Sequence, residues 1–311
     1  MAGESHQVTQ EELAAQRARV QGAEAGFPRL LAPTAATDAG TPYLSSPGVA
    51  LLARPQVSLE GLADFLDGFA PDLHFPQYLN DPTPLSPAAQ VCKVAGQLCY
   101  ASFSPKRTLN ADAARYFRNI KESGHGSVLE HANFTFLFYG ISRSVTHELV
   151  RHRMFSYSQV SQRYVSGKVL RFVERPEYAA DPALHAAFER RIDAAAADYE
   201  TTALRLLAQQ KAGAALLSGE ARTDLRKKVQ QAARSVLPNE TEAPIVVTGN
   251  VRAWRHFLEM RANPHAEIEI RELAFRTYLC LFAAESLLFE DYRITSLPDG
   301  TYGVETDFNK V

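Results

Sequence analysis

Residues 133–139 read NFTFLFY, and the alternation within this run decides the fold class. Successive side chains of a β-strand point to opposite faces, so Phe134, Phe136 and Phe138 fall together on one side of an extended chain. The run therefore predicts a β-strand with one phenylalanine face.

Other segments predict further strands and several helices. The β-branched runs VLRFVE at 169–174 and PIVVT at 244–248 are typical of strands. The expected helices are one over residues 91–98, one capped by Asn110 and ending near Gly124, one over about 182–217, one capped by Thr223 and ending at Val236, and a long amphipathic helix over 267–291. Strands and helices interleave without regular βαβ alternation, which favours an α+β fold of mixed sheet and long helices over a doubly wound sheet.

The chain is expected to be one main domain behind an N-terminal extension. Residues 1–85 would form that extension, partly helical or irregular, because the first 40 residues are rich in Ala, Glu, Gln and Gly. Prolines crowd the stretch from Leu73 to Pro87, which prevents a continuous helix and places the boundary near residue 85. Residues 86–311 would form the main domain, and neither the glycine-rich dinucleotide motif nor the P-loop motif occurs in them.

The composition is that of an ordinary folded protein. The chain has 311 residues, 46% of them apolar and 22% charged, with a formal net charge of -2. With so small a net charge, we expect neither nucleic acid nor a membrane as a partner. No apolar run approaches the roughly 20 residues of a spanning helix, and no signal peptide is evident, so we expect a cytoplasmic location. Cys92, Cys99 and Cys280 are expected to be core thiols.

The segment most suited to chemistry is 151–164, which reads RHRMFSYSQVSQRY and contains no acid. Arg151, Arg153 and Arg163 supply fixed positive charge, and the hydroxyls and carboxamides add hydrogen-bond donors, a combination that suits phosphate. A solvated basic loop paired with neighbouring acids is the structural alternative. The interleaved aromatic residues, Phe155 among them, weigh against a loop that lies only on the surface. The composition therefore favours an anion-binding site.

Two more segments hold clustered polar residues. Asn250 is placed to open a helix that carries Arg252, His256 and Arg261, and a charged helix face packed by one tryptophan is the alternative. The segment GHGSVLEH at 124–131 has two histidines and a glutamate. Their spacing matches no common zinc site, so no metal is expected.

Taken together, these segments resemble the flavin-dependent thymidylate synthases, whose signature is Arg-His-Arg, seven residues and then Ser. Residues 151–161 fit that signature. GHGSVLEH before a phenylalanine-alternating strand, SQRY after the signature, ARSVLP around Arg234, and the block from Asn250 through Arg261 to His265 also occur in family order. The resemblance covers about residues 90 to 290. It implies an α+β subunit that assembles as a homotetramer, with flavin and nucleotide bound where subunits meet.

The resemblance also implies a reaction. The expected activity is methylation of dUMP at ring carbon 5 to give dTMP, with methylenetetrahydrofolate as the carbon donor and NADPH, through FAD, as the source of hydride. Arg261 is the residue expected to act in catalysis. Its permanently charged guanidinium would stabilise negative charge on the pyrimidine as carbon 5 becomes nucleophilic.

Two sets of binding residues follow from the same resemblance. The residues expected at the flavin are Ser127, Glu130, Arg151, His152, Arg153, Gln159, Asn250, Arg252 and His256, with His125 close to them. The residues expected at the nucleotide are Glu148, Arg151, Gln159, Ser161, Gln162, Arg163, Arg234 and Arg261. Glu148 stands where many members of the family have Gln, an exchange that keeps hydrogen-bonding ability and changes the charge.

Two other functional classes stay open from the residues alone. A cysteine-dependent thymidylate synthase would make the same product with an activated thiol, but none of the three cysteines has a polar, cation-rich neighbourhood in the sequence. A non-enzymatic nucleotide- or RNA-binding module would use the Arg-rich segment for phosphate and an aromatic residue for base stacking. The small net charge and the lack of a second basic tract weigh against that module.

Overall fold

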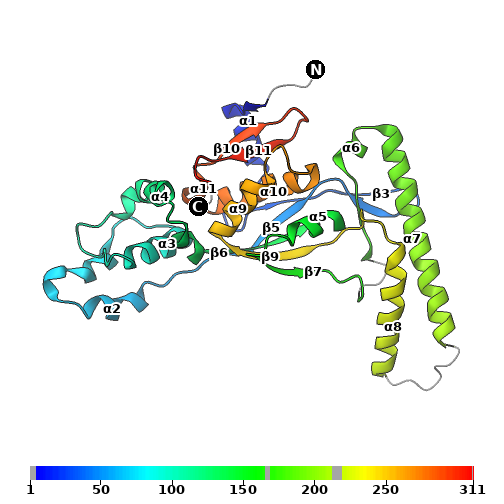
Figure 1. Cartoon of the computed structure of the whole chain (residues 1–311), viewed down its shortest axis with the longest axis horizontal. Helices are drawn as coiled ribbons and strands as arrows, with labels where there is room; N and C mark the ends of the chain where they lie inside the picture. The colour runs from blue at the N-terminus through cyan, green and yellow to red at the C-terminus, as the bar shows by residue number, and fades with distance from the viewer. Residues whose placement is uncertain (1–4, 165–168, 212–218, 310) are drawn as a thin grey trace.

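The computed structural model describes residues 5–164, 169–211, 219–309 and 311. Its centre is a five-stranded sheet in the order β2-β5-β6-β9-β7, in which all neighbouring strands are antiparallel (Figure 1). The strands are Arg29–Leu30 (β2), Gly48–Ala53 (β5), Asn133–Tyr139 (β6), Ile245–Asn250 (β9) and Ser156–Gln159 (β7). The strand expected over 133–139 is therefore confirmed, and it lies in the middle of the sheet.

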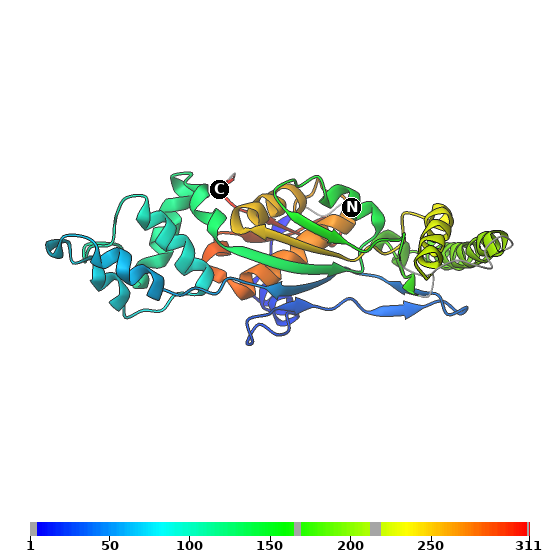
Figure 2. The same cartoon turned by 90° about the horizontal axis from the view of Figure 1, so that it is seen from below.

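The phenylalanine face of β6 is covered by helices. Its three phenylalanines are at most 1% exposed. The ring of Phe136 lies 5.1 Å from that of Trp254, which belongs to α9 (Val251–Arg261). The helix α10 (Ile268–Ala284) packs beside α9 and against β5 (Figure 2). The main core thus lies between the sheet and these two helices, and α9 is anchored directly on it.

The segment before residue 85 also supplies strands. β5 pairs with β6, with Leu51 opposite Phe136, and both Val49 and Leu51 are buried in the main core. The expectation of a helical or irregular extension is therefore wrong for residues 48–53. The run GVALLA is apolar on both faces, and pairing with β6 satisfies its backbone while Val49 and Leu51 are buried and Leu52 stays exposed. A domain boundary near residue 85 stays a prediction.

Two small sheets flank the central one, in the orders β1-β10-β11 and β3-β4-β8. Their strands are His6–Gln7 (β1), Arg293–Ser296 (β10), Tyr302–Glu305 (β11), Thr34–Ala36 (β3), Pro42–Leu44 (β4) and Phe172–Val173 (β8). The strand expected over 169–174 is thus present but shorter, and the one expected over 244–248 is confirmed as β9. Mixed strand pairing with many helices confirms the α+β class.

Four further helices follow the expected segments. They are Pro87–Leu98 (α3), Ala113–Glu122 (α4), Pro182–Lys211 (α7) and Gly219–Ala233 (α8), and α7 and α8 lie side by side (Figure 1). The helix α7 begins at residue 182 as expected, and the other three begin at other residues. The cap expected from Asn110 is wrong, because its side chain accepts a hydrogen bond from Nζ of buried Lys93 at 2.6 Å. The cap expected from Thr223 is wrong as well, because α8 begins at Gly219. Residues 212–217, expected to end the longer helix, lie outside the described residues.

The helix expected over 267–291 is interrupted. Glu267 caps α10, which ends at Ala284, and a second short helix follows after Glu285. Most residues of α10 are buried, so it is a core helix rather than an amphipathic one. The remaining short elements are Gln10–Ala18 (α1), Glu60–Leu62 (η1), Ala63–Asp67 (α2), Pro71–Leu73 (η2), Phe75–Asn80 (η3), Asn110–Asp112 (η4), Gly126–His131 (η5), Arg143–Leu149 (α5), Pro176–Ala179 (α6), Arg234–Val236 (η7) and Ser286–Phe289 (α11). In the part of the chain that the structure describes, no helix has the length and apolarity needed to cross a membrane.

Candidate active site

The Arg-His-Arg segment connects a short helix to the edge of the central sheet. The helix α5 begins after Ser142, whose hydroxyl accepts a hydrogen bond from a backbone N–H in the first turn at 3.3 Å. The chain then turns and enters the edge strand β7, which pairs with β9. Within the turn Arg151 and Arg153 are exposed, whereas His152 is buried. The turn therefore presents two guanidiniums to solvent and keeps the imidazole inside.

Phe155 packs the Arg-His-Arg turn against the central sheet. Its ring lies 4.3 Å from the ring of Trp254. It also lies so close to Gly249 that an added Cβ at that glycine would be 2.2 Å from a ring carbon. Gly249 on β9 is therefore the residue that permits the turn to pack against the sheet.

Arg261, the last residue of α9, reaches this turn. Its Nη1 donates to Oε2 of Glu148 at 2.7 Å, and its Nε donates to Nε2 of His152 at 3.0 Å. Its Nη2 lies 3.4 Å from the carbonyl oxygen of Glu148, the longest of the three contacts. The structure thus joins the residue expected in catalysis to one residue expected at the nucleotide and one expected at the flavin.

These contacts determine the protonation state of His152. Burial, the charge of Arg261 and the neighbouring His256 together lower the pKa of His152 to about 4. The imidazole is therefore neutral at pH 7. Because a guanidinium can only donate, Nε2 is the acceptor and the ring proton lies on Nδ1.

The other end of α9 holds a second group of expected residues. Asn250 caps the helix as expected, and its Oδ1 accepts from the backbone N–H three residues on at 2.8 Å. Arg252 donates from Nη1 to Oε1 of Glu130 at 2.6 Å, and Glu130 lies in the 3₁₀ helix η5. Two of the residues expected at the flavin are therefore paired with each other.

His256 lies between the two ends of the helix. Its side chain is 54% exposed, and the centre of its ring is 5.9 Å from that of His152. The helix α9 therefore carries Arg252, His256 and Arg261. Through Arg252 it contacts η5, and through Arg261 it contacts the Arg-His-Arg turn.

The carboxamides at the end of β7 form a third group. Gln162 is buried, its Oε1 accepts from Nη1 of Arg143 at 3.4 Å, and its Nε2 has no hydrogen-bond partner among the described residues. Gln159 donates from Nε2 to the hydroxyl of Thr146 at 3.4 Å. A buried donor without a partner is uncommon and costly. Gln162 therefore points to a bound acceptor at this segment.

The structure adds two basic residues that the sequence analysis missed. Arg143 lies in the first turn of α5 and contacts Gln162. Lys227, on α8, has its Nζ 5.4 Å from the ring centre of Tyr164, and the guanidinium carbon of Arg163 lies 5.6 Å from the same ring. Neither residue belongs to a motif, and the signal for Arg143 in the sequence is only a basic residue that follows a serine cap.

Two expected residues stay apart from these groups within one chain. Ser127 lies in η5 and Arg234 in η7. In the described part of the chain, neither side chain makes a recorded hydrogen bond or ion pair with another candidate residue. The same part contains no cluster of three or more His, Cys, Asp or Glu side chains able to hold a metal ion.

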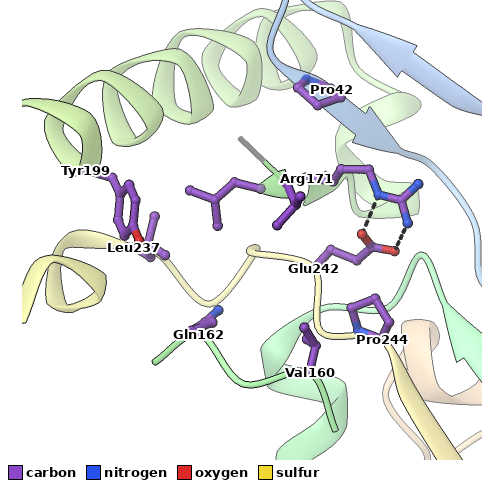
Figure 3. Close-up of a pocket in the computed structure, with 10 residues that line it drawn as sticks. Pro42, Val160, Gln162, Arg171, Tyr199, Leu237, Glu242 and Pro244 are labelled. Carbon is purple, nitrogen blue, oxygen red and sulfur yellow. Dashed lines mark hydrogen bonds and ion pairs between the residues drawn. The ribbon is translucent and has the colours of Figure 1, made fainter. Parts of the chain in front are cut away.

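A cavity of about 400 Å³ lies beside Val160 and Gln162, which follow the strand β7 (Figure 3). Gln162 lines it, and Arg171 forms a two-bond ion pair with Glu242 at its edge, with contacts of 2.6 Å and 2.8 Å. The rest of the wall is mostly apolar, and the residues expected at the flavin do not line it. Arg261 lines a different cavity, of about 610 Å³, with His265.

The charges of the candidate residues are unbalanced. Arg252 and Arg261 have acidic partners. The other candidate arginines have no recorded acidic partner in the described residues; they are Arg151, Arg153, Arg163 and Arg234. Guanidiniums without carboxylate partners are suited to phosphate and other anions, so the arrangement fits large anionic ligands rather than neutral ones.

Comparison with protein families gives a match over residues 83–283. The matching model describes the thymidylate synthase complementing proteins. The matched range includes the Arg-His-Arg turn with Arg261, the start of α9 with Glu130, and the carboxamides at the end of β7. It ends within α10.

Named relatives agree with that match. The chain is 48% identical over 214 residues to a flavin-dependent thymidylate synthase of Mycolicibacterium gilvum, covering 68% of this chain and 83% of that protein. It is 49% identical over 208 residues to the protein of the same description from Mycobacterium tuberculosis, covering 67% and 80%. Among solved structures, a UMP/dUMP methylase from Streptomyces cacaoi bound with 5-Br UMP has a TM-score of 0.53 at 20% identity, over 79% of this chain and 93% of that one. At that identity, the likeness shows a shared fold.

Proposed function

The chain belongs to the family of thymidylate synthase complementing proteins, and from that premise we propose that it methylates dUMP at ring carbon 5 to give dTMP. Methylenetetrahydrofolate would donate the carbon, and NADPH would supply the reducing hydride through FAD. The relatives named flavin-dependent thymidylate synthase support the reaction and the flavin. The observation that carries the proposal is the contact of Arg261 with His152 and Glu148, which joins the catalytic candidate to the Arg-His-Arg turn.

The residues expected at the flavin fit that group. FAD carries a pyrophosphate, and Arg151 and Arg153 are exposed guanidiniums without recorded acidic partners in the described chain. Arg252 and His256, on one helix, would border the same ligand with Ser127, Glu130, His152, Gln159 and Asn250. Bound FAD supplies hydride chemistry, and the residues of this chain supply its binding and orientation.

The nucleotide would lie against the third group of residues. Arg163, Ser161, Arg234 and the unpartnered amide of Gln162 would hold the phosphate of dUMP, with Arg151 and Gln159 beside it. Arg143 joins this set because it already contacts Gln162. The dianionic phosphate explains why guanidiniums outnumber carboxylates here.

Arg261 would face the uracil. Its Nε and Nη1 are committed to His152 and Glu148, so those two residues fix the plane of the guanidinium. The longer contact of Nη2 leaves that nitrogen the freest donor for the pyrimidine. A planar cation held in place before the substrate binds stabilises developing negative charge without having to reorganise.

The alternatives are weaker than this proposal. Cys92 and Cys280 are buried, and burial raises the pKa of each thiol to about 12, so neither is a nucleophile at pH 7. Cys99 is exposed, which corrects the expectation of a core thiol, and its thiol donates to the backbone carbonyl of Ala95 at 3.4 Å. An RNA-binding module is not favoured, because the relatives are enzymes by name.

We also propose a homotetramer. Ser127 and Arg234 make no recorded side-chain contact with the other candidates in the described part of one chain. A second subunit that adds its own residues would complete the site. Sedimentation should show a tetramer, and a stable, active monomer would contradict this assembly.

The reaction is tested by an assay with dUMP, methylenetetrahydrofolate, NADPH and FAD together, from which each component is omitted in turn. dTMP should form only in the complete mixture, apart from FAD that stays bound on purification. Formation of dTMP by thoroughly deflavinated protein without added FAD would contradict the flavin-dependent route. No dTMP from folded, FAD-loaded protein in the complete mixture would contradict the reaction itself.

A further inference from the structure

Tyr157 contacts the Arg-His-Arg turn at two backbone points. Its hydroxyl oxygen lies 2.6 Å from the carbonyl oxygen of Leu149 and 2.7 Å from the carbonyl oxygen of His152. Leu149 is the last residue of α5, and His152 is the middle residue of the turn. A side chain on the strand β7 therefore closes the turn that leads into that strand.

The two carbonyls have few other partners. The last four carbonyl oxygens of a helix receive no hydrogen bond from N–H groups of the same helix, so they need partners outside it. The carbonyl of Leu149 accepts from the N–H of His152 at 3.1 Å, and the carbonyl of His152 accepts from the N–H of Phe155 at a longer 3.3 Å. A hydroxyl has one proton, so Tyr157 donates to one carbonyl at a time while staying within reach of both.

The backbone of His152 determines where its imidazole lies. That imidazole accepts from Nε of Arg261, so a shift of the turn changes the contact that orients the guanidinium. We propose that Tyr157 is a positioning residue for the methylation of dUMP, which acts through His152 on Arg261. This inference rests on the proposed function and concerns the same site.

The kinetic test is the variant Tyr157→Phe, which removes the hydroxyl and keeps the ring. Its kcat should fall about 3- to 10-fold, the effect of losing one hydrogen bond, while KM for dUMP changes less than twofold. The matched control is Tyr43→Phe, whose hydroxyl donates to Glu189 at 3.4 Å in a separate small core with Phe188. The control should have wild-type kcat.

A spectroscopic test does not depend on turnover. The groups that face the imidazole of His152 are Arg261 and His256 from α9, with Glu148 of α5 bonded to Arg261. With ring-labelled histidine, NMR should show His152 of the wild-type protein neutral down to about pH 4. In Tyr157→Phe the pKa should rise towards the ordinary value, because a looser turn admits water and moves Arg261 away.

The outcomes separate the two claims. A Tyr157→Phe protein with wild-type kcat and a wild-type His152 titration would overturn the positioning role. Loss of the fold in that variant would also overturn it, since Tyr157 would then be a structural residue. A wild-type protein that makes no dTMP would refute the proposed function, and the NMR comparison would still decide whether Tyr157 positions His152.

Discussion

Arg261 and His152 are joined by a hydrogen bond of 3.0 Å from Nε to Nε2, although 109 positions separate them in the sequence. The neutral imidazole accepts this bond without adding charge, so the guanidinium keeps its positive charge while losing rotational freedom. Glu148 holds the same guanidinium from its other side at 2.7 Å. The geometry therefore prepares a fixed cation at the end of α9.

The charge of Glu148 should weaken the binding of an anion beside Arg261. In Glu148→Gln, dUMP should bind about 2- to 5-fold more tightly, because a carboxylate near the nucleotide is replaced by a neutral amide. Calorimetric titration of the protein with dUMP measures this change. Glu122→Gln, an exposed change at the end of α4, serves as the control. Binding that weakens in Glu148→Gln would contradict this electrostatic effect of the carboxylate.

Arg151 should contribute to retention of flavin. In Arg151→Ala, FAD should bind about 10- to 100-fold more weakly, because a hydrogen bond from a guanidinium to phosphate is typically worth about 1.5–3 kcal/mol. Flavin absorbance after reconstitution and desalting gives the affinity. Arg118→Ala on α4, another exposed arginine, should retain flavin like the wild type. Equal retention by both variants would remove Arg151 from the flavin site.

The buried carboxylate Asp291 should stabilise the fold that supports α9. It accepts two bonds from Arg255 at 2.9 Å and 2.8 Å and one from Lys121 at 2.7 Å. Asp291→Asn leaves both buried cations without a charged partner, so the free energy of unfolding in urea should fall by about 3–5 kcal/mol. Asp307→Asn, which removes an exposed partner of Arg293, should change the free energy of unfolding far less, because water screens that ion pair.

The same carboxylate predicts the direction of the pH dependence. Bonds and charges from Arg255 and Lys121 hold the pKa of Asp291 well below its ordinary value, against the effect of burial. Its stabilisation is therefore complete above the unfolded pKa of about 3.9 and is lost as the pH falls towards the folded value. Unfolding of the wild type should become easier below about pH 4. Asp291→Asn should lack this contribution, and an identical acid profile for the two proteins would contradict it.

Secondary structure was predictable where the sequence has a clear hydrophobic alternation or a residue that caps a helix. The alternation of Phe134, Phe136 and Phe138 predicted β6, and Asn250 predicted the start of α9. Prediction failed where contacts between distant segments determine the role of a residue or the conformation of a run. Asn110 has the chemistry of a helix cap, but the buried ammonium of Lys93 offers its carbonyl a stronger partner. The run at 48–53 has no alternation, so only its pairing with β6 reveals it as a strand.

Only part of the candidate site was predictable from the sequence. The Arg-His-Arg segment was visible from its composition, and the role expected of Arg261 came from the family resemblance, whereas the contacts of Arg261 with His152 and Glu148 are seen only in the structure. Arg143 and Lys227 were missed because their contacts with Gln162 and Tyr164 exist only in the folded chain. The roles of Ser127 and Arg234 stay predictions, because the structure of one chain records no contact that joins them to the other candidates.

The most direct test of the account compares dTMP formation by Arg261→Ala with that of the triple variant Cys92→Ser, Cys99→Ser, Cys280→Ser, each folded and loaded with flavin. Arg261→Ala should lose about 10²- to 10³-fold in product formation, the scale for removing one charge-stabilising donor. Arg261→Lys should recover little, because an ammonium lacks the planar fork. The triple variant should stay active, apart from stability lost to buried hydroxyls. A near-normal rate in Arg261→Ala, with activity lost in the well-folded cysteine variant, would contradict electrostatic activation of dUMP and favour a thiol-dependent reaction.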